Sequence, residues 1–96
     1  MRPDCSSVIF SGHAVTRMFE RSITKEEVMK AVALGEVIRF YPDDRPHPSY
    51  LMLWKGQGRV LHVVLARDEG TGACYIITVY QPSLEIWDSD YRNRRK

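Results

Sequence analysis

The spacing of apolar and polar residues predicts two short helices near the start of the chain. The first begins after Ser11, a helix N-cap residue, and ends near Glu20. Its apolar side consists of Ala14, Val15, Met18 and Phe19. The motif TKEE has the form of a capping box, so a second helix starts after Thr24 and ends at Gly35. Both helices are expected to pack through their apolar sides on the rest of the protein.

The remainder of the chain has the pattern of β-strands. Four strands are predicted, at residues 36–41, 50–55, 59–67 and 73–80. They are separated by a proline-rich segment and by two glycine-containing turns. The simplest arrangement is an α+β fold of order ααββββ. In it, both helices cover one face of a four-stranded antiparallel meander.

Alternation along these strands assigns their residues to two faces of the sheet. The apolar face, expected beneath the helices, comprises Ile38, Phe40, Leu51, Leu53, Leu61, Val63, Leu65, Tyr75, Ile77 and Val79. The second face mixes aromatic, basic and hydroxyl side chains: Arg39, Tyr41, Tyr50, Met52, Trp54, Val60, His62, Val64, Cys74, Ile76, Thr78 and Tyr80. The assignment assumes that Lys55 pairs with Arg59 and Ala66 with Cys74. His62 would then lie between Met52 and Thr78.

Composition narrows the class of protein. The 96 residues are 44% hydrophobic and 27% charged, which predicts one folded domain with a core at residues 8–92 and a basic tail at 92–96. The chain shows no membrane-spanning stretch and no signal peptide, so a cytoplasmic monomer or weak homodimer is expected. Cys5 and Cys74 form no CxxC motif and are expected to be reduced thiols. No metal site, Walker motif or other cofactor signature is present in the sequence, so no cofactor is expected.

Several residues are suited to RNA chemistry without a metal. His13, Arg17 and Arg21 recur every fourth residue along the polar side of the first helix. Cleavage of RNA needs a base, an acid and a cation near the phosphate, which His, Tyr and Arg side chains provide. The aromatic second face would stack unpaired bases. Each residue also has a structural interpretation: His62 as a hydrogen-bonded, half-buried residue, and Trp87 as an anchor for the tail.

Four sequence blocks resemble a known family. They are HAVTRMFERSITKEEV (13–28), GRVLHVV (58–64), IITVYQP (76–82) and WDSDYR (87–92). Together they resemble a small bacterial family, the domain of unknown function numbered forty-two fifty-eight. Ser22 stands where that family often has Gly. The family is in turn similar to toxin ribonucleases of the barnase, colicin and RelE type, which implies a RelE/barnase-like fold, an RNA substrate and a cognate antitoxin as partner.

Two functions are open at this point. The first is a toxin–antitoxin-type, metal-independent endoribonuclease acting on single-stranded RNA. The resemblance and the chemistry then assign catalytic roles to His13, Arg17, His62 and Tyr80. Substrate binding would fall to Arg21, Arg39, Tyr50, Trp54, Thr78 and Arg92. The second is a non-enzymatic RNA- or protein-binding module that uses the aromatic face of the sheet.

Overall fold

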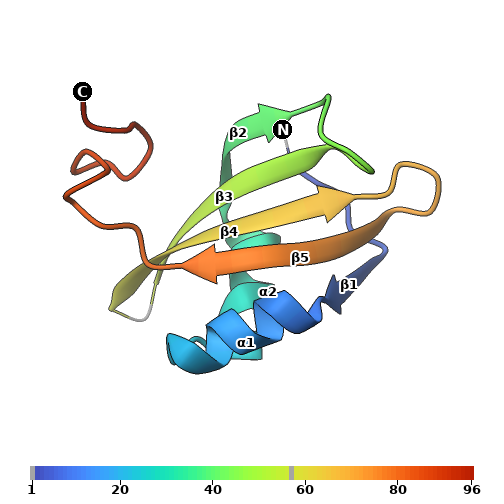
Figure 1. Cartoon of the computed structure of the whole chain (residues 1–96), viewed down its shortest axis with the longest axis horizontal. Coiled ribbons are helices and arrows are strands. Elements are labelled where there is room, and N and C mark those ends of the chain that lie inside the picture. Colours follow the sequence, from blue (N-terminus) through green and yellow to red (C-terminus); the bar gives the residue numbers. More distant parts are fainter. Residues whose placement is uncertain (1, 57) are drawn as a thin grey trace.

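The computed structural model describes residues 2–56 and 58–96. Two helices are formed, α1 (Gly12–Glu20) and α2 (Lys25–Leu34). The strands are β1 (Ser7–Phe10), β2 (Glu36–Tyr41), β3 (Ser49–Gly56), β4 (Arg59–Arg67) and β5 (Ala73–Tyr80). They form one sheet in the order β1-β5-β4-β3-β2, and the chain after β5 continues without a further helix or long strand (Figure 1).

The prediction of a four-stranded antiparallel meander is wrong. Strands β2 to β5 do form an antiparallel meander, but β1 adds a fifth strand that runs parallel to β5, with Ser7 opposite Ala73. The fold remains α+β. A four-residue strand is too short to show an alternating pattern, and its partner lies at the other end of the sequence.

Both helix starts are confirmed. The Ser11 side chain accepts a hydrogen bond from the Ala14 backbone N–H, and Thr24 forms the expected capping box with Glu27. Glu27 also pairs with Arg59 of β4, which holds the pKa of the Glu27 carboxyl at about 2. Ser22, in the turn between the helices, has a φ of 54°, the left-handed conformation that favours glycine.

Helix α1 packs through a narrower stripe than its apolar pattern predicts. Ala14 and Met18 are buried against the sheet, whereas Val15 is 53% exposed and Phe19 is 87% exposed. Helix α1 contacts β5, close to one edge of the sheet, and α2 contacts β3 and β4. Because α1 lies at the edge, the side of the helix that carries Val15 and Phe19 faces solvent.

The side chains of strand β3 lie on the opposite faces of the sheet from those predicted, because its register is shifted by one residue. Leu53, rather than Met52, lies opposite His62, and Gly56 rather than Lys55 pairs with Arg59. Met52 and Trp54 therefore face the helices and belong to the core. The sequence YLMLW is apolar at every position, so its alternation carries no information about the two faces.

A β-bulge causes a second difference in β5. Val64 lies opposite Thr78 but Leu65 lies opposite Ile76, so one extra residue is inserted between them. As a result Cys74 and Ile76, predicted on the second face, enter the core, whereas Tyr75 and Ile77, predicted in the core, do not. Beyond the bulge the predicted faces hold, with Val79 in the core.

The two cysteines are joined, contrary to the expectation of reduced thiols. Cys5, which precedes β1, forms a disulfide with Cys74 of β5. The bond fastens the start of the chain to the strand beside which β1 lies. Among the described residues, no helix has the length and apolar content needed to cross a bilayer.

Candidate functional site

The face of the sheet opposite the helices, here called the helix-free face, carries three rows of side chains across β2, β3, β4 and β5. The first row consists of Glu36, Leu53, His62 and Tyr80. The second consists of Arg39, Leu51, Val64 and Thr78. The third consists of Tyr41, Ser49, Ala66 and Tyr75. These rows follow from the observed pairing, because residues directly opposite one another in neighbouring strands share a face.

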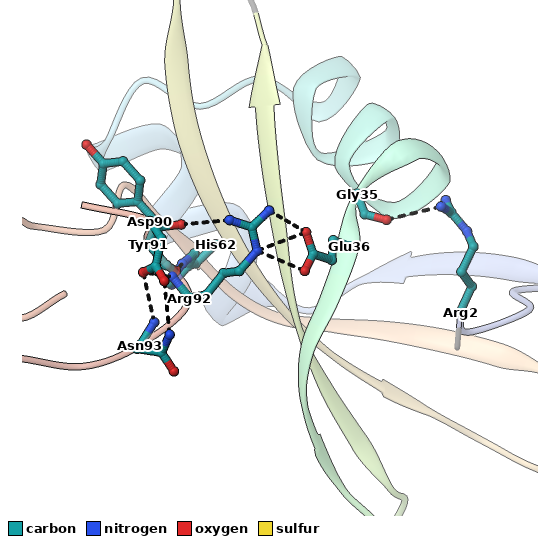
Figure 2. Close-up of polar contacts among 8 residues, drawn as sticks. All are labelled: Arg2, Gly35, Glu36, His62, Asp90, Tyr91, Arg92 and Asn93. Atoms are coloured by element: carbon teal, nitrogen blue, oxygen red, sulfur yellow. Dashed lines mark hydrogen bonds and ion pairs between the residues drawn. The ribbon is translucent and has the colours of Figure 1, made fainter. Parts of the chain in front are cut away.

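The C-terminal segment, residues 81–96, covers the first row. Trp87 is 4% exposed and meets the His62 ring edge to face, with ring centroids 4.5 Å apart. Arg92 makes an ion pair with Glu36 at 2.7 Å, and its backbone is held by Asp90 (Figure 2). Trp87 therefore is the anchor predicted from the sequence, and the basic tail is fixed to the sheet at Arg92.

His62 is fully buried, and both of its ring nitrogens are occupied. Its Nε2 lies 2.8 Å from the backbone carbonyl oxygen of Tyr91, and its Nδ1 lies 3.1 Å from the hydroxyl of Tyr80. A carbonyl oxygen only accepts hydrogen bonds, so Nε2 carries the proton and Nδ1 accepts the bond from the Tyr80 hydroxyl. Burial lowers the pKa of His62, against a smaller opposing effect of the bond to Tyr91.

The Tyr80 hydroxyl is held as a neutral donor. Burial raises the pKa of Tyr80, while the positive charges of Arg94 and Arg21 act in the opposite direction. The ordinary pKa values of 10.0 for tyrosine and 6.5 for histidine already make transfer of the proton from Tyr80 to His62 unfavourable by about 5 kcal/mol. Burial of both groups widens this difference, so the pair rests in its neutral form.

Arg21 reaches the same end of β5 from α1. Strand β1 pairs with β5 only as far as Ile76, and side chains then satisfy carbonyl groups along the remaining edge. Ser11 Oγ donates to the Ile76 carbonyl at 3.0 Å, and Arg21 Nη1 donates to the Val79 carbonyl at 2.7 Å. Arg21 also borders a surface hollow of about 380 Å³ together with Tyr80 and Gln81.

Arg94 approaches from the C-terminal segment. Its guanidinium lies over the ring of Trp87, 5.5 Å from the ring centroid. Within the part of the chain that the structure describes, neither Arg94 nor Arg21 forms an ion pair with a carboxylate. The surroundings of Tyr80 therefore hold two guanidinium groups, from two different elements, whose charges are not neutralised by the protein.

The other residues singled out from the sequence are dispersed. His13 is exposed on α1, and Arg17 is partly exposed and pairs with Glu20 at 2.8 Å. Tyr50 and Trp54 lie on the helix side of β3, Trp54 within the core, so neither belongs to the helix-free face. Arg39 and Thr78 occupy the second row of that face.

Metal chemistry has no visible centre in the described residues. Residues 2–56 and 58–96 bring together no group of three or more His, Cys, Asp or Glu side chains that would hold an ion. The chemically distinctive cluster is instead the set of Arg21, His62, Tyr80 and Arg94.

Comparison with known proteins identifies the family but no activity. Residues 10–81 match the model of a family described as "Domain of unknown function (DUF4258)". The chain belongs to the DUF4258 family. No curated protein and no solved structure is significantly similar to it. In this DUF4258 member, Arg21, His62 and Tyr80 lie inside the matched region, whereas the segment that covers them follows it.

Two residues of that segment that belong to the surroundings of His62 and Tyr80 were not singled out from the sequence. Tyr91 contributes only a backbone carbonyl, which leaves no mark in the side-chain pattern. Arg94 belongs to a terminal run of basic residues, and such runs are usually solvated. The signals that this segment is part of the fold were the resemblance in the WDSDYR block and the prediction of Trp87 as an anchor, whereas the matched family region ends at residue 81.

Proposed function

We propose that this DUF4258 protein binds single-stranded RNA at the end of β5, with Arg21 and Arg94 holding backbone phosphate beside Tyr80. The observation that carries the proposal is a pair of guanidinium groups without carboxylate partners among the described residues, both acting on Tyr80: Arg21 borders an open hollow with Tyr80, and Arg94 lies over Trp87. A guanidinium presents a planar fork of donors that matches a phosphate, and its charge attracts a polyanion.

The rest of the helix-free face suits unpaired bases. Beyond the C-terminal segment it presents Tyr41, which is 44% exposed, and Ile77, which is 40% exposed, with Thr78 in the second row. Aromatic and apolar side chains on an exposed sheet stack bases of single strands, and a hydroxyl serves as a donor or acceptor. RNA bound at Tyr80 would continue along this face.

Binding is better supported than cleavage because neither histidine proposed as catalytic is placed to transfer a proton to or from RNA at Tyr80. His62 has no free nitrogen and is neutral, and His13 lies exposed on α1. One arrangement favours an endoribonuclease as the second candidate. The Tyr91 carbonyl orients His62, and His62 accepts a hydrogen bond from the Tyr80 hydroxyl, which is the relation of orienting group, base and reactive hydroxyl in nucleophilic sites. The cytoplasmic location and the cognate antitoxin stay predictions.

The binding proposal is tested by fluorescence anisotropy of a labelled 12-nucleotide RNA with the full chain, in EDTA, over a range of salt concentrations. Replacing Arg21 or Arg94 by Gln should weaken binding about tenfold. Each replacement should also reduce the slope of log K against log salt by about 0.7, because one phosphate contact is lost. The matched control is Arg17→Gln on the same helix, which should change affinity less than twofold, since Arg17 is paired with Glu20.

Two outcomes would contradict it: no saturable binding by the wild type, or equal losses in all three variants. Because Arg21 also bonds the Val79 carbonyl, Arg21→Lys provides a check on folding. This variant keeps the charge and should retain most of the salt dependence. In the same mixtures, gel analysis tests the enzyme. Cleavage in EDTA that Tyr80→Phe abolishes, with RNA still bound, would establish the endoribonuclease.

A further inference from the structure

A second hollow lies at the other end of the helix-free face, beside the third row of side chains. It has a volume of about 360 Å³ and is bordered by the loop between β2 and β3 and by residues of β4 and β5. His62 and Ala66 mark the two ends along β4 and are four residues apart, which corresponds to about 13 Å of strand. A single strand of RNA held at Tyr80 would therefore reach this hollow within a few nucleotides.

The lining of the hollow includes two aromatic rings, which form one wall. The rings of His47 and Tyr75 lie nearly parallel, at 8° to one another with centroids 5.9 Å apart. Ile77, which the β-bulge turns toward this face, adds an apolar side chain that is 40% exposed. Such a wall accepts a planar, apolar-faced ring, and nucleobases bind to proteins by stacking on surfaces of this kind.

The lining of the hollow also includes one oriented carboxylate. Asp44 Oδ2 accepts a hydrogen bond from the hydroxyl of Ser49, a side chain that is 2% exposed. The backbone N–H of Asp44 donates to the Tyr41 carbonyl, which fixes the residue in its turn. In the described part of the chain Asp44 has no basic partner, and its Oδ1 accepts no hydrogen bond. The free oxygen of this carboxylate can therefore accept hydrogen bonds from the edge of a ring that stacks on the aromatic wall.

The chemistry of a carboxylate selects among the bases. An ionised carboxylate only accepts hydrogen bonds, so it favours a base edge with neighbouring donors. On its Watson–Crick edge guanine presents two adjacent donors, N1–H and the N2 amino group. Adenine, cytosine and uracil each place an acceptor next to their donor. We propose that this hollow binds a guanine base, stacked beside His47 and Tyr75 and bonded to Asp44.

The proposal rests on the proposed function for the source of the base as RNA, although a free guanine nucleotide offers the same ring. Calorimetric titration of the full chain with GMP, IMP, AMP, CMP and UMP measures the base preference without RNA. GMP should bind at least tenfold more tightly than AMP, CMP or UMP. IMP, which lacks the amino group, should fall between them. Equal affinities for the five nucleotides would overturn the proposal.

The variants identify the residues. Asp44→Asn should remove the preference for GMP, and Tyr75→Ala should weaken GMP binding by about tenfold. The matched control is Asp43→Asn, the neighbouring acidic residue, which does not border the hollow and should leave the preference unchanged. A preference that survives Asp44→Asn, or is lost equally in Asp43→Asn, overturns the assignment.

RNA measurements separate this proposal from the function on which it rests. Oligonucleotides that differ only in one central base should show a guanine preference that Asp44→Asn removes, whereas Arg21→Gln weakens all of them equally. RNA binding without base preference overturns the guanine site and leaves the proposed function intact. GMP binding without RNA binding overturns the proposed function and supports the hollow as a site for the free nucleotide.

Discussion

At the scale of single residues, the buried side chain of His62 holds the C-terminal segment on the sheet through hydrogen bonds. It connects the middle of the sheet to the Tyr91 carbonyl of the C-terminal segment through Nε2–H, and to the Tyr80 hydroxyl through Nδ1, which accepts a hydrogen bond only while the ring is neutral. Protonation of Nδ1 would require the Tyr80 hydroxyl to rotate and accept this bond instead of donating it. Of the two interpretations of His62 made from the sequence, catalytic and structural, these contacts favour the structural one.

This arrangement predicts a specific pH dependence of stability. The pKa of His62 is lowered by folding, so below the ordinary value of about 6.5 the unfolded chain binds a proton that the folded protein excludes. The free energy of unfolding should therefore be highest above this pH. Below it, the loss due to this residue is at most about 1.4 kcal/mol per pH unit. Urea unfolding from pH 7.5 to 4.5 measures the effect.

The control for His62 is His62→Gln, which removes the titrating ring and keeps an amide able to form hydrogen bonds. The wild type should lose more stability than this variant between pH 7 and 5. Parallel curves for the two proteins would contradict the assignment of a neutral, buried His62. His13 and His47 are present in both proteins, so the comparison isolates the effect of His62.

At the scale of elements, α1 separates two neighbouring apolar residues into different environments. Met18 is 8% exposed and Phe19 is 87% exposed. Met18→Ala should lower the free energy of unfolding by about 2–3 kcal/mol, because it leaves a cavity against β5. Phe19→Ala should change it by less than about 0.5 kcal/mol, since the ring has little to contact. Urea midpoints of the two variants measure the difference, and a larger effect at Phe19 would show that α1 is rotated.

Local signals predict elements better than they predict how the elements combine. The caps at Ser11 and Thr24 could be identified because a capping side chain bonds a backbone only three residues away. The orientation of β3 could not, since YLMLW is apolar on both sides of the strand. The same limit applies to the candidate site: Arg21 and Tyr80 could be singled out from the sequence, but not the fact that they lie close together. Their proximity depends on where α1 meets the edge of β5, which no local pattern specifies.

At the scale of the whole molecule, the disulfide between Cys5 and Cys74 spans 69 residues. Closing a loop of that length restricts the unfolded chain, and the expected contribution to stability is about 4 kcal/mol in the chain-entropy description. Adding dithiothreitol, or replacing Cys5 by Ser, should lower the urea midpoint accordingly. Stability that is unchanged by both treatments would show that the thiols are not joined in solution, as expected for a reducing compartment.

The parallel pairing of β1 with β5 also determines the order in which the strands of the sheet can pair during folding. Strands β2 to β5 are joined by short connections and form local hairpins, whereas β1 can pair only after the distant strand β5 is in place, with Ser7 opposite Ala73. Pairings between distant parts of a chain are slow to form, because the loop between them must first be closed. During synthesis the first strand emerges long before its partner exists. A nascent chain that stops before β5 therefore leaves β1 exposed, with its backbone groups unpaired.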